Sequence, residues 1–108
     1  MAVPPKATLT IPNGQTASDT LILETSGARR PYTLTFYSPT TLPETVTVQA
    51  SDTVGGTSIA LQSAGSDITL PANKATVIVV VLAAEIKLVA GSGVGADRAF
   101  TVLASALR

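Results

Sequence analysis

The chain has 108 residues, a common length for one domain, and its seven Lys and Arg balance seven Asp and Glu, so its net charge is zero. Charged residues make up 13% of the chain, about half of the ~25% usual in soluble domains, which leaves little charge to keep copies apart or to neutralise nucleic-acid phosphates. The missing basic excess and the few aromatic residues also lead us to expect no nucleic-acid partner. Without His or Cys, the chain cannot form Ser-His-Asp or Cys-His nucleophiles or thiolate metal sites, so we expect no enzyme activity, cofactor or small-molecule substrate.

Apolar residues stand at every second position over much of the chain, which is the period of β-strands. We expect residues 1–6 to form an N-terminal arm and residues 1–108 to form one all-β domain, an antiparallel β-sandwich or jelly-roll-like fold with about eight strands and almost no helix. Strands are predicted at Ala7–Ile11, Ser18–Glu24, Pro31–Ser38, Glu44–Ala50, Thr57–Leu61, Ile68–Leu70, Thr76–Leu82, Glu85–Ala90 and Arg98–Ala104.

Four of these strands have patterns that predict their surroundings. Pro31–Ser38 alternates so that Tyr32, Leu34 and Phe36 face the core while Tyr37 faces outward. Thr76–Leu82 is so rich in β-branched residues that we predict a buried central strand. The last two strands flank the glycine-rich residues 91–97, which predicts a final antiparallel hairpin.

No motif in the chain supports a catalytic or metal site. The acidic residues lie singly in turns and at strand ends, where carboxylates are usually solvated. Gly91–Gly95 precedes no predicted helix, so a phosphate-binding loop is disfavoured, and Gly93–Asp97 is only one copy of a calcium-type β-roll pattern. The longest apolar stretch, Val77–Ala84, is less than half of the roughly 20 residues that span a bilayer, so we expect no membrane anchor.

Arg29 and Arg30 form the only adjacent basic pair in the chain. A solvated loop would explain the pair, but an arginine fork also suits an anchor on an acidic neighbour. Tyr32 and Tyr37 follow closely enough that we predict one contact patch containing all four residues. The outward position of Tyr37 fits either an interface residue or a second packed face, and the sequence leaves both open.

Four strings of turns and strands stand out in the chain: Thr41–Gln49, Leu61–Ile68, Ala84–Leu88 and Ala96–Val102. They resemble those of small tailed-phage virion proteins. The resemblance covers most of the chain and implies a capsid decoration or cement protein. Such a protein would be made in the cytoplasm of the host bacterium and located on the capsid surface of the virion. Its implied partners are the major capsid protein and copies of itself, as a homotrimer.

Two other functions remain open at this point. The first is a structural component of the neck, tail or baseplate of the same kind of particle. The second is a carbohydrate-binding module, which the absence of Trp disfavours because sugar rings commonly stack on exposed aromatic side chains.

Overall fold

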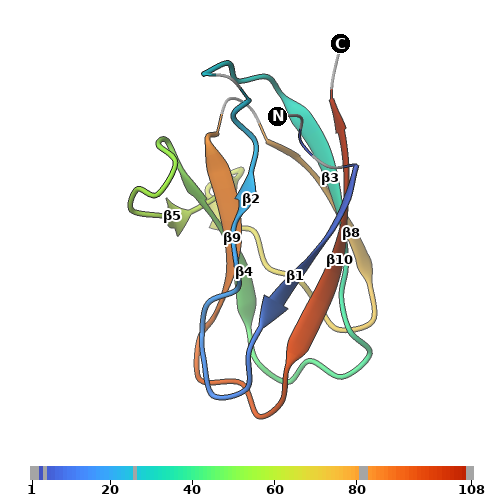
Figure 1. Cartoon of the computed structure of the whole chain (residues 1–108). Coiled ribbons are helices and arrows are strands. Elements are labelled where there is room, and N and C mark those ends of the chain that lie inside the picture. Colours follow the sequence, from blue (N-terminus) through green and yellow to red (C-terminus); the bar gives the residue numbers. More distant parts are fainter. Residues whose placement is uncertain (1–2, 4, 26, 81–82, 107–108) are drawn as a thin grey trace.

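The protein is built from β-strands in two sheets that pack face to face (Figure 1). The computed structural model describes residues 3, 5–25, 27–80 and 83–106, and no helix occurs among them. The predicted all-β sandwich is therefore confirmed. The first sheet has the order β1 (Lys6–Ile11), β10 (Arg98–Ala106), β3 (Tyr32–Tyr37) and β8 (Ala75–Val80), and the second sheet has the order β2 (Leu21–Ile22), β9 (Glu85–Ala90), β4 (Val46–Ser51) and β5 (Ile59–Ala60).

The eight strands pair from the ends of the domain toward its middle. β1 pairs with β10, β2 with β9, β3 with β8, and β4 with β5, all antiparallel. The pairs β10–β3 and β9–β4 then complete the two sheets. This nested order is the strand order of a jelly roll, which closes a double sheet with two Greek keys.

As the chain crosses from the first sheet to the second, its antiparallel neighbour changes from β10 to β9 by way of the connecting residues 91–97. Beyond β1, the Gly14 amide donates to the Val94 carbonyl at 2.8 Å, and the Ser18 amide donates to the Leu88 carbonyl at 2.9 Å. Ala17 faces Val89, whereas Leu21 faces Ile86, so the register shifts by one residue between these two pairs. That shift is a β-bulge, a common device for bending a strand.

The core lies between the two sheets and is mostly aliphatic. Tyr32, Leu34 and Phe36 are buried, and Tyr37 is 48% exposed, as the alternation in β3 predicts. Buried residues come from both sheets, so each sheet covers one side of the same core. The fully buried large side chains are Phe36, Phe100, Leu9, Ile11, Leu23, Leu34, Ile86, Leu88, Val46, Val48, Val80 and Val94.

Two of the expectations about neighbouring strands are wrong. β8 is not central but lies at the edge of the first sheet, and its Val77 and Val79 are 62% and 54% exposed. β9 and β10 do not form a hairpin, because they belong to different sheets and residues 91–97 connect the sheets instead. In addition, the predicted strand at Ile68–Leu70 is only a bridge between Thr69 and Thr47, and Leu82 lies outside the described residues.

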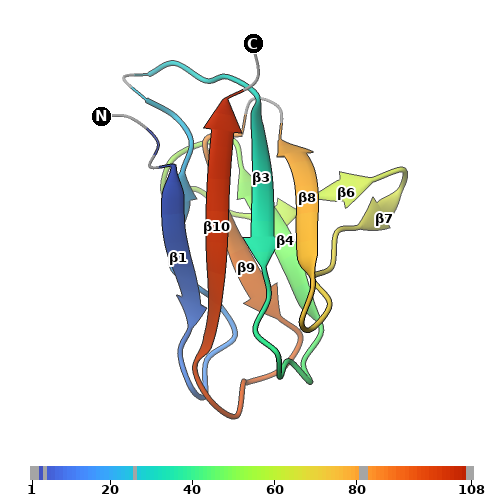
Figure 2. The same ribbon diagram turned by 90° about the vertical axis from the view of Figure 1, so that its right-hand side faces the viewer.

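Residues 61–68 form a small projection, which we call the arm. The arm contains the hairpin of β6 (Gln62–Ser63) and β7 (Ser66–Asp67), and it extends past the edge of β8 (Figure 2). Ala64 and Gly65 at its tip both have positive φ, 54° and 83°. Positive φ at both central residues is typical of a type I′ turn, so residues 62–67 form a tight hairpin.

Candidate interaction surface

The outer face of the first sheet is almost free of charge. Registers across the sheet place Leu103 beside Thr35, and Thr35 beside Val77. One charged side chain, that of Lys6 at the start of β1, belongs to this face within the described residues. The other members of the outer face are Thr8, Thr10, Thr33, Thr35, Tyr37, Ala75, Val77, Val79, Ala99, Thr101, Leu103 and Ser105.

The outer face ends at the edge strand β8, which has a strand partner on only one side among the described residues. The Ser38 amide donates to the Lys74 carbonyl at 3.0 Å, which fixes which β8 residues point their backbone groups toward β3. Because these groups alternate along an antiparallel strand, the N–H and C=O groups of Ala75, Val77 and Val79 point away from β3. Among the described strands, only β3 pairs with β8.

A groove runs between β8 and the arm. Its volume is about 490 Å³, and Leu61 and Ile68 line it from the arm while Val77, Ile78 and Val79 line it from the strand. The wall is therefore mainly apolar, and it lies directly beside the free edge of β8. A peptide strand laid along that edge could place alternate side chains in this groove.

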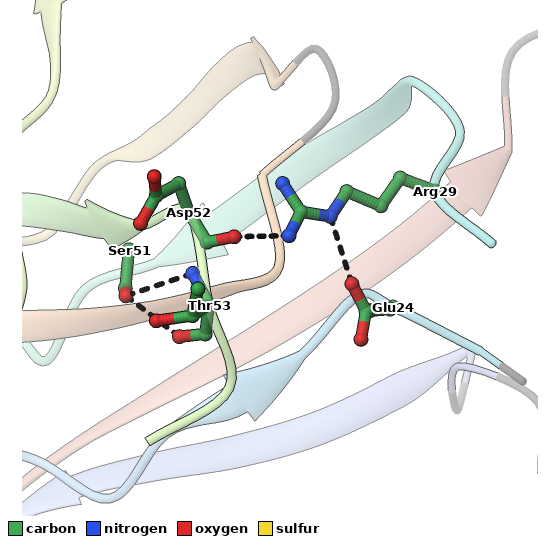
Figure 3. A network of polar contacts seen from close by, with 5 residues as sticks. All are labelled: Glu24, Arg29, Ser51, Asp52 and Thr53. Atoms are coloured by element: carbon green, nitrogen blue, oxygen red, sulfur yellow. Dashed lines mark hydrogen bonds and ion pairs between the residues drawn. The ribbon is translucent and has the colours of Figure 1, made fainter. Parts of the chain in front are cut away.

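Arg29 contacts two loops of the fold. Its Nε donates to Glu24 Oε1 at 2.8 Å, and its guanidinium also donates to the Asp52 carbonyl (Figure 3). In the same loop, the Ser51 hydroxyl donates to the Thr53 carbonyl at 2.7 Å. Arg29 thus ties the loop after β2 to the loop after β4.

The structure does not bring the four predicted interface residues into one patch. Tyr32 is 7% exposed and belongs to the core, so its part in an interface is not supported. Tyr37 lies on the opposite face of β3, and Arg29 makes the internal contacts described above. Arg30 and Tyr37 are exposed and the Arg29 side chain is 31% exposed, so an interface role stays a prediction for these three residues.

The acidic residues are not all solvated as the sequence suggested. Glu85 is 4% exposed, and its Oε1 accepts a hydrogen bond from the Gly55 amide. Asp97 accepts from the Asn13 amide at 2.8 Å, and Asp19 accepts from the Thr10 amide at 2.9 Å. These carboxylates stabilise loop and edge amides, which is a structural role.

Glu44 and Arg98 form a two-bonded ion pair at the end of the sandwich opposite Arg29. Arg98 Nε and Nη2 donate to the two carboxylate oxygens of Glu44 at 3.0 and 3.2 Å, and the two side chains are 10–12% exposed. These hydrogen bonds from Arg98 hold the pKa of Glu44 below its usual value of 4.5. The pair joins the loop before β4 to the start of β10.

The lowered pKa gives a pH-dependent contribution to stability. Because Glu44 is more acidic in the folded chain than in the unfolded chain, its contribution is complete above pH 4.5 and is lost as pH falls through the folded pKa. Denaturant unfolding across a pH series measures this contribution. At neutral pH the free energy of unfolding should be larger for the wild type than for Glu44→Gln, and the difference should disappear in acid. The Arg98→Gln variant should lack this pH-dependent part of the stability as well. A stability difference between the wild type and Glu44→Gln that persists in acid would contradict this role of the ion pair.

The described part of the chain holds no cluster of three or more acidic, His or Cys side chains that could bind a metal ion. It also contains no helix that could cross a bilayer. Comparisons with protein-family models, curated proteins and solved structures found no match to this chain.

Proposed function

We propose that the chain is a structural virion protein that binds the outside of a phage capsid and stabilises it. The observation that carries the proposal is the outer face of the first sheet, which spans four strands with Lys6 as its one charged member among the described residues. A face of Thr, Val and Ala can be covered by a protein surface without leaving buried charges unpaired.

Two further properties support this role. The whole chain is neutral and poor in charge, which suits a subunit held by its neighbours more than a free monomer. The jelly-roll strand order also occurs in viral capsid domains, although it occurs in lectins and cupins as well, so the fold alone carries little weight. The resemblance to small virion proteins adds the location on a tailed-phage capsid.

A glycan-binding role is less well supported than a capsid role. Tyr37 is the one aromatic side chain exposed among the described residues, and the residues around it on the outer face are Thr and Ala. Sugar binding commonly uses an aromatic ring together with several convergent polar groups in a cleft. The groove beside β8 offers Gln62 and Ser63 but no ring.

The proposal is tested with particles assembled with and without this chain. We expect particles that lack the chain to assemble but to release their DNA at a lower temperature, because an outer subunit bridges its neighbours only after assembly. Adding back the purified chain should restore the release temperature. An unchanged release temperature, or a copy number that fits only one ring at the neck or tail, would contradict a capsid decoration role.

The same assay tests the outer face. Leu103→Lys places a charge on this face at a side chain that is 38% exposed, so the fold should tolerate it while particle binding falls. Val89→Lys, on the outer side of the second sheet, is the matched control and should bind as the wild type does. Equal binding by the wild type and Leu103→Lys would exclude this face as the contact surface.

A further inference from the structure

The four sheet edges of the sandwich differ in how they are protected. β2 and β5 have two residues each, too short to offer a long template for another strand. The edge of β1 has Lys6 at its start, and the amide of Thr10 is occupied by Asp19 Oδ1 at 2.9 Å. β8 has six residues, none of them charged and none of them Pro, so it lacks these forms of protection.

The free edge of β8 presents backbone and side chains together. Val77 and Val79 point their N–H and C=O groups away from β3, and the same two residues have exposed side chains. A row of such donors and acceptors is satisfied by water or by another extended strand, and apolar side chains beside it favour the strand. The strands of the arm pair with each other and not with β8, and a groove of about 490 Å³ lies between the arm and β8.

We propose that β8 pairs antiparallel with β8 of a second copy of this chain, about a two-fold axis at Ile78. In this register, Val77 lies opposite the partner's Val79, and Val79 lies opposite the partner's Val77. The N–H and C=O groups of both Val77 and Val79 point away from β3, toward the second copy. Each of these residues can therefore exchange backbone hydrogen bonds with the residue opposite it. The strand edge is thus complementary to itself, as an interface with two-fold symmetry requires.

The charges near β8 are compatible with this pairing. Lys74, just before the strand, is the nearest charged residue in the sequence, and β8 itself has none. Antiparallel pairing about Ile78 separates the two copies of Lys74 along the strand direction by about 26 Å, at roughly 3.3 Å per residue. The zero net charge of the chain adds no overall repulsion between copies.

Pairing through β8 would join two four-stranded sheets into one continuous sheet and bring the two outer faces side by side. This inference does not rest on the capsid role, since it concerns the isolated chain. It also differs from the homotrimer implied by the resemblance, because a two-fold pairing of one edge closes at two subunits.

The mass of the purified chain in solution tests the proposal. Analytical ultracentrifugation over a dilution series should give about twice the 10.9 kDa of one chain. Val77→Lys should shift the protein to the mass of a single chain, because a charge then lies at the paired edge. Leu103→Lys changes the same outer face on an inner strand and should stay dimeric.

The proposal would be overturned by a wild-type chain that is a monomer or a trimer, or by a Val77→Lys variant that remains dimeric. Circular dichroism of Val77→Lys must show the β-sheet spectrum of the wild type. Should that variant not fold, Val79→Lys serves the same purpose, because its side chain is also exposed at the free edge.

Cysteine cross-linking tests the register. The chain has no Cys, so introduced thiols have no native competitor. Mixing Val77→Cys with Val79→Cys under oxidising conditions should give a disulfide-linked pair, because directly opposed residues of this kind have Cα atoms about 5.5 Å apart. Val77→Cys alone should link poorly. Efficient linking of Val77→Cys with itself would overturn the register about Ile78.

Discussion

Replacing Phe36 with alanine is expected to lower the free energy of unfolding by about 3–5 kcal/mol, the usual cost of truncating a buried phenylalanine. Phe36 is 0% exposed in the core between the two sheets, and β10 and β8 hold its strand on either side. Those backbone contacts hinder collapse into the cavity left by the ring. Urea unfolding followed by circular dichroism measures the difference.

Tyr37→Ala is the matched control for this change. Tyr37 is the next residue of β3, but its side chain lies on the outer face and is half exposed, so its loss should cost only about 1 kcal/mol. Equal losses for the two variants would contradict the inward and outward assignment of β3.

The second large effect is expected at Ser18, a buried hydroxyl at the crossing between the sheets. The Leu88 amide donates to Ser18 Oγ at 2.9 Å, and the hydroxyl in turn donates to the Asp19 carbonyl at 2.7 Å. This contact lies next to the β-bulge, where the register between the two strands shifts. The serine hydroxyl therefore takes the place of a backbone carbonyl that the shifted register does not supply.

Ser18→Ala would leave the buried Leu88 amide without its acceptor. We expect a loss of about 1–3 kcal/mol in the free energy of unfolding, the cost of one unsatisfied buried donor. Hydrogen exchange at the Leu88 amide should become faster in the variant. Thr16→Ala, on an exposed side chain of the same crossing, should change stability by less than about 0.5 kcal/mol. Unaltered exchange at Leu88 would exclude this role for Ser18.

The sequence predicted which side of each strand faces the core, because that depends on a period of two in the side chains. The inward Phe36 and the outward Tyr37 follow from this pattern. Which strands lie side by side depends on backbone pairing, about which the side-chain period carries no information. For that reason the side-chain pattern wrongly predicts a central strand around Val77 and a hairpin of β9 and β10 across residues 91–97.

The predicted interface patch differs from the structure in the placement of Tyr32 and in the contacts of Arg29. Tyr32 and Tyr37 are an odd number of positions apart on one strand, so the period of two already puts them on opposite faces. The internal role of Arg29 could not be predicted, because Asp52 is 23 residues away and reaches it only through the fold. The exposure of the β8 valines could not be predicted from the sequence, because it depends on the edge position of the strand.

The nested pairing of the strands also constrains the order in which the domain can fold. β4 and β5 close a short loop, whereas β1 and β10 unite segments from opposite ends of the domain. Closing the outer pair first would require a very large loop, and its entropic cost falls once the inner strands have met. Assembly that begins at the middle of the chain and proceeds outward is therefore the least costly route. Because so many contacts are distant in sequence, the topology belongs with slowly folding β-proteins.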